Sequence, residues 1–482
     1  MSLSTALNTA QNSLLNTQRQ TSVLSRNMAN ADNPDYNRRT AVLSSLHPGA
    51  RVVDIQRSTD AALFKQNLTA LSGWSAQSKI VYELDRLSLD VNGVDHATSP
   101  AMLIGQFQEA LQLYSSTPSN RTLAENSIEM AREVVRSLND GSASIQSFRS
   151  QMDGEIAQGV EELNSLLADF KKVNDEIIRA SRSGRDALDA HDTRDAILKR
   201  VSEFVPISTI SRDDNDLMIV TADGTTLFET DPRPVSFEPT VVYGSATVGN
   251  RILVDGVPLA KSTGANTTGG GSLAAMVQLR DSFAVEMQSQ LDEVARGLIQ
   301  TFSETDPNPP NDVVAGLFTW PGAPNVPAAG TVETGLASGI SLNATVDPSK
   351  GGDVERLRDG VAFDFNPDGN ASFSEYLIDK VNSLDEPMTF VTNGGVTASQ
   401  SLMTFSAGSI SWLEDARKTA SSAAETKSAT MFRTSEVLSN LTNVNVDEEM
   451  ALMLQLEQSY AASAKMMQMI DEMLQTLLSV VR

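Results

Sequence analysis

The chain has 482 residues and a formal net charge of −24, because 61 Asp and Glu outnumber 37 Lys and Arg; it contains no cysteine. The length is that of about three domains. The negative charge argues against binding to nucleic acids or anionic membranes. The lack of cysteine excludes disulfides, zinc–thiolate sites and cysteine nucleophiles. Neither a membrane-spanning apolar run nor a cleavable signal is recognisable, so these features alone predict a cytoplasmic protein.

The first 30 residues predict a long amphipathic helix. Positions spaced alternately by three and four residues are mostly apolar, which is the a/d pattern of a helix face that needs a partner helix. A cluster of turn residues follows at 30–36, and its Pro34 must end the helix. The predicted face consists of Leu3, Leu7, Ala10, Leu14, Thr17, Thr21, Leu24 and Met28.

Residues 38–205 predict short extended segments followed by mostly helical structure. A helix at 59–71 is expected to end at Gly73, and another turn is expected at Asn92 and Gly93. Pro100 is a favourable first residue for a further helix, which Pro118 should end. The apolar spacing from 122 to 182 predicts two long helices, or one bent near Gly141, packed as a bundle.

The segment 192–195 (Asp-Thr-Arg-Asp) is predicted to cap a short helix that ends near residue 205, and to form ion pairs there. Residues 206–264 change to a β pattern. Asp223 and Gly224 predict the turn of a hairpin over 217–228. The segments 241–243 and 252–254 predict further strands.

A helix over 273–302 is expected after the glycine run 269–271. We interpret this run as a flexible joint rather than a phosphate-binding loop, because no Lys-Ser or Lys-Thr follows it. Residues 304–397 are rich in Pro, Gly, Asn and Asp and predict an outer, β-rich insert. Helical periodicity returns over 398–442.

One segment of the insert has the spacing of a calcium-binding loop. Asp364, Asn366 and Asp368 occupy its positions 1, 3 and 5, with Gly369 at position 6 and Glu375 at position 12. However, a proline stands at position 4, and Asn, Asp and Gly are also the usual residues of turns. A solvated loop is therefore our preferred interpretation of 364–375, and we predict no metal site.

No catalytic constellation is recognisable. The three histidines, His47, His96 and His191, are far apart in the sequence, and no nucleophile elbow or zinc-protease motif occurs. We therefore predict a protein that is not an enzyme, with no catalytic residues and no cofactor.

The last 38 residues predict a second long amphipathic helix. Asn445 is a plausible N-cap, and the acidic residues 447–449 suit the positive end of the helix dipole. Glu449 and Ser463 are the only residues that interrupt the a/d face. That face consists of Val446, Met453, Leu456, Tyr460, Met467, Ile470, Leu474, Leu477 and Val481.

These two ends resemble the bacterial flagellar axial proteins, the family of rod, hook and hook-associated proteins. The N-terminal similarity lies in Asn-Met-Ala-Asn at 27–30 followed by Pro34, Tyr36 and Arg38. The C-terminal similarity lies in the segments 447–450, 458–460, 462–465 and 471–474. The family turn motif would comprise Asn30, Pro34 and Tyr36. This chain has Asn-Pro-Asp-Tyr at 33–36, where the family usually has Thr-Pro-Gly-Tyr.

Together, the pattern and the resemblance imply a mainly α protein with β-rich inserts. The terminal helices, within 1–72 and 440–482, would form a coiled-coil inner domain. A long-helix bundle would comprise 73–205, 265–303 and 398–439. The segment 206–264 would be a small β region, and 304–397 an outer β domain.

The resemblance implies a structural role in the flagellum, at the junction between hook and filament. Export would use the flagellar type III pathway, without signal cleavage. The partners would be further copies of the chain, the hook protein, a second junction protein and an export chaperone at 446–482. The alternatives are another axial protein of the hook or distal rod, or a secreted calcium-binding adhesin with coiled-coil ends.

Overall fold

The computed structural model describes residues 3–45, 50–92, 99–259, 270–391 and 399–480. The chain forms two compact units. The terminal unit comprises Met1–Ser72, Leu163–Pro234 and Lys427–Arg482, and the central unit comprises Gly73–Glu162 and Val235–Thr426. Three helices contribute residues to both units: α2 (Ala61–Leu87), α4 (Arg121–Ser183) and α11 (Leu402–Thr442).

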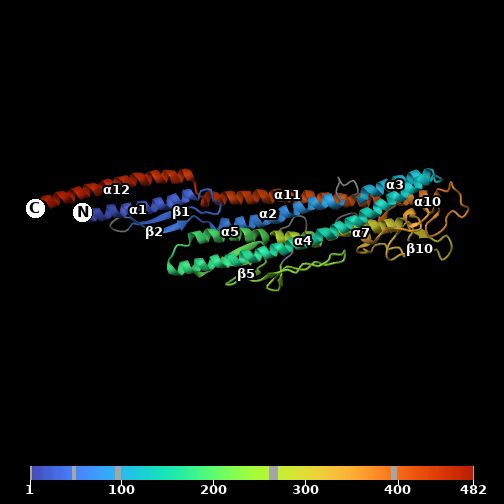
Figure 1. The fold of residues 1–482 in the computed structure, drawn as a ribbon, viewed down its shortest axis with the longest axis horizontal. Coiled ribbons are helices and arrows are strands. Elements are labelled where there is room, and N and C mark those ends of the chain that lie inside the picture. The colour runs from blue at the N-terminus through green and yellow to red at the C-terminus, as the bar shows by residue number, and fades with distance from the viewer. Residues whose placement is uncertain (1–2, 46–49, 93–98, 260–269, 392–398, 481–482) are drawn as a thin grey trace. The chain divides into compact units, whose positions relative to one another are not determined.

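In the terminal unit, α1 (Leu3–Ala29) and α12 (Val446–Val480) lie side by side (Figure 1). Their direction is antiparallel, because Asn27 contacts Glu449 while Ser13 contacts Ser463. The predicted N-cap is confirmed: Oδ1 of Asn445 accepts hydrogen bonds from the backbone N–H groups of residues 447 and 448, at 3.0 and 3.4 Å.

Two small antiparallel sheets complete the terminal unit, together with α5 (Leu188–Phe204). The first is the hairpin of β1 (Arg39–Ser45) and β2 (Ala50–Arg57), which packs against α1. The second has the order β3 (Ile207–Ser211), β4 (Leu217–Thr221) and β5 (Thr226–Phe228). The predicted hairpin is confirmed, and Gly224 adopts the positive φ of 89° that its turn requires.

One expected helix break does not occur, because α2 continues through Gly73. Of the two alternatives for residues 122–182, the structure has the single helix: α4 is one helix of 63 residues. A glycine inside a helix costs roughly 1 kcal/mol relative to alanine, which packing of the helix offsets. At Gly141 a Cβ would lie 3.1 Å from Cδ1 of Leu291, so a larger residue there would require that side chain to shift slightly.

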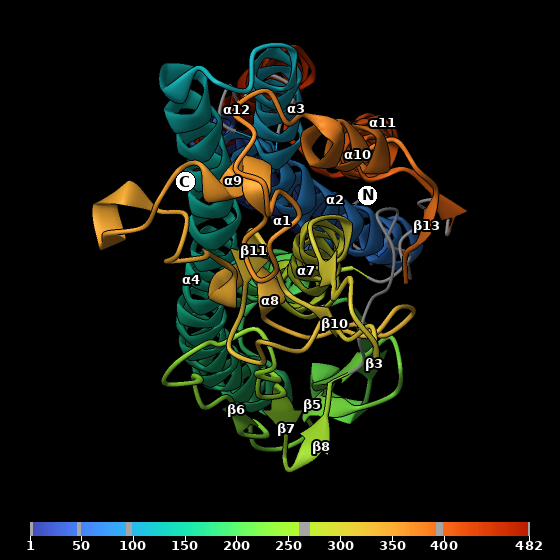
Figure 2. The ribbon, with the colours of Figure 1, turned by 90° about the vertical axis from the view of Figure 1, so that its right-hand side faces the viewer.

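The central unit is built on helices, and Figure 2 shows α3 next to α10 and α7 next to α8. Helix α3 begins at Pro100 and ends at Ser116, as predicted. The helix predicted at 273–302 is present as two α-helices, α6 and α7, which are joined by a π-helical turn, η3. The helical elements are η1 (Ser88–Asn92), α3 (Pro100–Ser116), α6 (Ser272–Gln278), η3 (Leu279–Phe283), α7 (Ala284–Thr301), α8 (Leu336–Gly339), η4 (Pro348–Lys350), α9 (Arg356–Asp359) and α10 (Glu375–Ser383).

The insert contains less β structure than its composition led us to expect. Its described strands are two-residue pieces joined by loops and short helices: β9 (Glu304–Thr305), β10 (Val313–Val314), β11 (Phe318–Thr319), β12 (Ser341–Leu342) and β13 (Met388–Thr389). The last of these pairs with β14 (Ser399–Gln400), which follows the insert. Pro and Gly favour turns over long ladders. Nearby, β6 (Val235–Ser236), β7 (Leu253–Val254) and β8 (Val257–Pro258) form a small sheet, whereas 241–243 is not a strand.

The observed units divide the chain differently from the expected domains, because 163–205 groups with the terminal helices rather than with a separate bundle. Ion pairs from α5 to the β1–β2 hairpin account for part of this grouping. The expected features at Gly93, His47, His96, the glycine at 269 and Val481 lie outside the described residues. Among the described residues, no helix has the length and apolar character of a membrane span.

Candidate assembly interface

The predicted face of α1 is the face that packs in the terminal unit. All eight of its residues are at least partly covered, and Ala10, Thr17 and Leu24 are buried. Helix α12 provides most of the cover, and the β1–β2 hairpin covers a flank. There, the amide of Asn16 pairs with the backbone of β2: its Oδ1 accepts from Val52 N–H at 3.0 Å, and its Nδ2 donates to the carbonyl of Ala50.

The predicted face of α12 is covered only in part. Ile470 is buried, and Met453, Leu456, Met467 and Leu474 are half-buried. By contrast, Val446, Tyr460 and Leu477 keep 46%, 52% and 56% of their surface exposed. Helix α12 exposes further apolar side chains outside this face: Met450, Leu452, Leu454, Met466, Met469, Met473 and Leu478.

The two polar residues that interrupt the α12 face are buried and contact α1. The hydroxyl groups of Ser463 and Ser13 lie 2.8 Å apart. Glu449 is fully buried and accepts a hydrogen bond from Nδ2 of Asn27 at 2.9 Å. A polar residue at an a/d position fixes which residues face one another, because a shifted pairing would leave it buried without a partner. These two contacts therefore set the register of α1 against α12.

Asn27 uses its complete hydrogen-bonding capacity in a buried cluster. Its Nδ2 donates to Glu449 and to the carbonyl of Arg39, both at 2.9 Å. Its Oδ1 accepts from the hydroxyl of Tyr36 at 2.8 Å and from the N–H of Arg39 at 3.1 Å. One amide thus joins the end of α1, the following turn, the start of β1 and the start of α12.

Arg38 neutralises the buried carboxylate of this cluster. Its Nε donates to Oε1 of Glu449 at 2.7 Å, and its Nη1 lies 3.2 Å from the exposed Glu448. Its backbone N–H donates to the carbonyl of Thr442 at 2.7 Å, so the same residue also holds the end of α11. A buried carboxylate is tolerable only with such a charged, hydrogen-bonded partner. We refer to Asn27, Tyr36, Arg38, Arg39 and Glu449 as the Asn27 cluster.

The turn motif lies next to this cluster, but its members differ in role. Tyr36 is buried and contacts Asn27, whereas the side chain of Asn30 donates to the carbonyl of Arg26 at 2.9 Å, within its own helix end. The N–H of Tyr36 closes the turn on the carbonyl of Asn33 at 3.1 Å. Asp35 has no positive φ, so this turn around Pro34 does not require the glycine that is usual in the family.

We expected the segment 192–195 to cap α5. Instead, it lies within the helix. The expected ion pairs are confirmed. Asp192 lies 3.2 Å from Nη2 of Arg39 and 3.0 Å from Nη1 of Arg57, and Asp195 lies 2.8 Å from Nη1 of Arg57. Arg39 also contacts Asp189 at 2.5 Å. The β1–β2 hairpin is therefore attached to α5 through Arg39 and Arg57.

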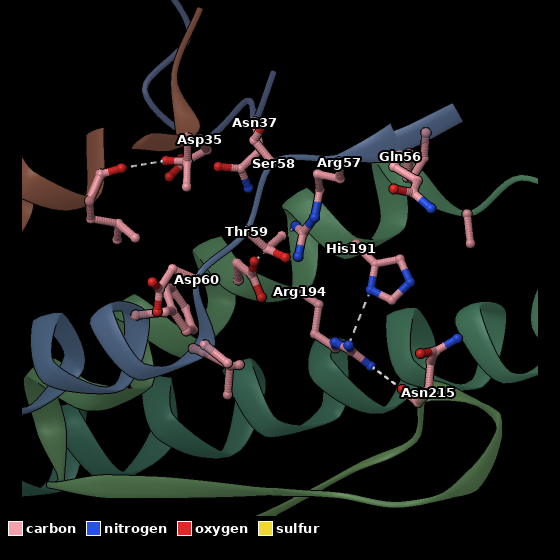
Figure 3. A pocket seen from close by; sticks show the side chains of 18 of the residues that line it. Asp35, Asn37, Gln56, Arg57, Ser58, Thr59, Asp60, His191, Arg194 and Asn215 are labelled. Carbon is pink, nitrogen blue, oxygen red and sulfur yellow. Dashed lines mark hydrogen bonds and ion pairs between the residues drawn. The ribbon is translucent and has the colours of Figure 1, made fainter. Parts of the chain in front are cut away.

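A cleft of the terminal unit adjoins these ion pairs, and Figure 3 shows Arg57, His191 and Arg194 along it. Nη2 of Arg194 lies 3.1 Å from Nδ1 of His191. Because a guanidinium only donates, Nδ1 must accept, and the imidazole is neutral with its proton on Nε2. Burial, followed by the charges of Arg194 and Arg57, lowers the pKa of His191 to about 4. Burial likewise lowers the pKa of Arg194 to about 10.

The calcium-like segment forms a self-contained turn. Oδ1 of Asn366 accepts from the N–H of Asn370 at 2.9 Å, and its Nδ2 donates to Asp359 at 2.6 Å. Oδ1 of Asp364 accepts from the N–H of Asn366 at 2.9 Å. Several oxygens that a cation would need are thus directed at the chain itself. Within the part of the chain that the structure describes, no group of three or more His, Asp or Glu residues is placed to hold a metal.

The sequence patterns located the helix faces but not the Asn27 cluster. Asn27 and Arg38 stood within the recognised motif without a role, and Glu449 was read as an interruption. The sequence does contain one indication of this cluster: Glu449 is an acidic residue at an a/d position, and a carboxylate buried there requires a cationic or amide partner.

The antiparallel terminal helices leave part of the apolar face of α12 exposed. Two family models match the chain. The description "Flagellar hook-associated protein FlgK helical domain" matches residues 94–307, and "Flagellar basal body rod FlgEFG protein C-terminal" matches residues 439–480.

A curated relative, flagellar hook-associated protein 1 of Bacillus subtilis (strain 168), is 21% identical over 97% of this chain and 96% of its own length. The chain belongs to the family of flagellar hook-associated protein 1, FlgK, and is a structural component of the bacterial flagellum. A solved structure, the flagellar hook junction protein FlgK from Burkholderia pseudomallei, is 15% identical with a TM-score of 0.42, covering 53% of this chain and 46% of that one.

Proposed function

We propose that copies of this chain form the junction between hook and filament, and that they assemble through α1 and α12. The observation that carries this proposal is the incompletely covered face of α12. Val446, Tyr460 and Leu477 belong to its heptad face yet remain about half exposed. Helices of neighbouring copies would complete their burial, and contacts of this heterologous kind generate rings or helical tubes.

The antiparallel register adds support. Asn27 faces Glu449 and Ser13 faces Ser463, so residues whose numbers add to 476 lie opposite one another. The residue opposite Leu3 is then Met473, and α12 continues to Val480 beyond the first described residue of α1. Near that end of α12, Leu477 and Leu478 are exposed and would be available to a helix of another copy.

The free energy of assembly depends on the balance between burying apolar side chains and ordering the backbone. Full burial of a Leu, Ile or Met side chain contributes roughly 1.5–3 kcal/mol, whereas ordering a residue costs roughly 1–2 kcal/mol of backbone entropy. We therefore expect the parts of α1 and α12 farthest from the Asn27 cluster to be weakly ordered in the isolated chain and to become fixed on assembly. Hydrogen exchange on the monomer checks this: uniformly protected amides over 3–29 and 446–480 would contradict it.

The partners follow from this position. They are further copies of the chain, the hook protein on one side and the second junction protein on the other. The exposed apolar side chains of α12 would also need cover before export, and we propose that a chaperone binds them at 446–480. Export through the flagellar type III channel would place the assembled protein outside the cell.

Electron microscopy of cells lacking the chain tests the position, with the culture medium probed for flagellin. Bare hooks together with flagellin lost to the medium are the expected result. Absent hooks would place the protein in the rod or hook instead, and normal filaments would overturn the axial role. Complementation with wild-type protein but not with a variant lacking 446–482 would locate the assembly surface in α12.

A further inference from the structure

A loop of the central unit presents three valines to solvent. Val241, Val242 and Val248 keep 95%, 74% and 83% of their surface exposed. Residues 239–250 contain no charged side chain, in a chain with a net charge of −24. The loop closes at its base, where Nδ2 of Asn250 donates to the carbonyl of Glu238 at 2.9 Å. We call residues 238–250 the valine loop.

Buried charges hold the valine loop in place. Asp153 accepts from the N–H of Thr240 at 2.5 Å and from the hydroxyl of Tyr243 at 2.8 Å. Arg149 donates to the carbonyl of Gly244 at 3.3 Å and to that of Thr247 at 2.5 Å. These anchors lie on α4, and both charged side chains are almost completely buried.

Arg280, which interrupts the apolar pattern of its helix, supplies the third anchor. It lies in the π-helical turn, is fully buried, pairs with Asp153 and donates to the carbonyl of Asn250 at 2.7 Å. A Cβ at Gly249 would overlap the Arg280 guanidinium, so glycine permits this close approach. The loop is therefore ordered in advance, and much of the entropic cost of a contact through its valines has already been met.

The valine loop has the composition of a strand but no strand to pair with. The segment 240–243 consists of Thr, Val, Val and Tyr, which favour β structure. In the described structure it pairs with no other strand. Unpaired strand-forming residues at a surface are suited to adding to the edge of another sheet.

The terminal unit offers such an edge at β3, which among the described strands pairs with β4 alone. The N–H of residue 222 donates to the carbonyl of Pro206 at 3.0 Å, and the N–H of Arg212 donates to the carbonyl of Asp216 at 2.8 Å. These two bonds lie at the two ends of the β3–β4 ladder. In an antiparallel pair, successive residues of a strand alternate between bonding to the partner strand and pointing away from it. Since residues 206 and 212 both bond across, the even-numbered residues of β3 bond to β4. The backbone groups of Thr209 and Ser211 therefore point away from β4.

Thr209 and Ser211 also line the cleft of the terminal unit. The side chains around the cleft include the apolar residues Phe64, Leu198, Leu217 and Leu438. The cleft thus combines an open strand edge with apolar surface that could receive valine side chains.

We propose that the segment 240–243 of one copy adds to the open edge of β3 in a second copy. Because neighbouring residues of a strand point to opposite faces of the sheet, the side chain of one of the two valines, Val241 or Val242, enters the cleft. This contact rests on the proposed function, because it joins identical subunits that the terminal helices bring together. Two copies that each carry a charge of −24 repel one another, so an uncharged, prearranged segment is a suitable contact. The contact is heterologous, with different surfaces on the two copies, as a ring requires.

The absence of cysteine makes the contact testable by disulfide formation. Cells would carry two tagged versions of the full chain, one with V241C or V242C and the other with T209C or S211C. A disulfide forms only when the Cα atoms come within roughly 4.4–6.8 Å, so mild oxidation of isolated flagella reports the pairing between copies. V257C is the matched control, because Val257 is an exposed valine in the same unit.

The expected result is a disulfide that joins the two differently tagged versions of the chain when one carries V241C or V242C. V257C should form no such disulfide. Flagella that contain both versions without this disulfide would overturn the proposal, and so would dimers that join V241C only to itself. Normal filaments in cells lacking the chain would instead overturn the proposed function.

Sedimentation of the purified full chain provides a second measurement. We expect V241D/V242D to weaken self-association at least tenfold without changing the circular dichroism spectrum. Equal self-association of the variant and the wild-type chain would overturn the contact, even where the cysteine variants fail to assemble.

Discussion

Replacing Asn27 by alanine tests whether the Asn27 cluster joins the two ends of the chain. The substitution removes four hydrogen bonds at once, to Tyr36, to both backbone groups of Arg39 and to Glu449. A buried polar group left without a partner costs about 1–3 kcal/mol. Water can enter the vacated space and reach some of these groups, so we expect a total loss of about 3–5 kcal/mol in the free energy of unfolding of the terminal unit.

Hydrogen exchange followed by mass spectrometry is the suitable assay, because it reports the terminal unit separately from the central unit. In Asn27→Ala, the amides of β1 and of the first turns of α12 should exchange at least a hundredfold faster, whereas those of α7 should not change. Asn30→Ala is the matched control. Asn30 belongs to the same sequence motif, but its side chain donates to the preceding helical turn, and loss of this hydrogen bond should cost less than about 1 kcal/mol.

Equal exchange in the two variants would refute the reasoning, since it would mean that the cluster contributes no more than a surface asparagine. Asn27→Asp sharpens the test. It keeps the shape but places a second carboxylate beside the buried Glu449, so it should destabilise at least as much as alanine.

Three further predictions concern separate features. Asp153→Ala leaves buried Arg280 without one of its carboxylates and should lower the free energy of unfolding by about 3–5 kcal/mol; urea unfolding checks this, and a loss no greater than in Glu125→Ala, whose ion pair is exposed, would contradict it. Ser463→Ala should cost about 1 kcal/mol, but Ser13→Ala/Ser463→Ala less than about 0.5, because the double variant leaves no hydroxyl unpaired; a double variant less stable than the single one would be inconsistent. The pKa of His191 is lowered from 6.5 to about 4, so between these pH values the unfolded chain binds a proton that the folded chain does not, and the folded state loses stability as the pH falls from 6.5 to about 4. Between pH 7 and pH 5, the unfolding temperature should therefore fall less for His191→Gln than for the wild-type chain. Identical decreases would argue against this role of His191.

Sequence periodicity and capping residues by themselves determined where the principal helices of this chain begin and which faces they bury. Pro100 opens α3 and Asn445 caps α12 as predicted, because such signals act over three or four residues. The covered face of α1 follows from heptad spacing for the same reason. The signals erred where packing outweighs a local preference, as at Gly73, which α2 passes without a break.

Only the tertiary structure decided which polar residues meet. Asn27 and Glu449 are 422 residues apart, and Arg57 and Asp192 are 135 apart, so no local spacing connects them. The same limit explains the segment 240–243: its composition favours a strand, but strand formation requires an edge to pair with, and its own unit instead holds it as a loop through buried charges. The sequence determines which faces and segments need partners, whereas the tertiary structure decides which of those needs are met within the chain and which remain for another molecule.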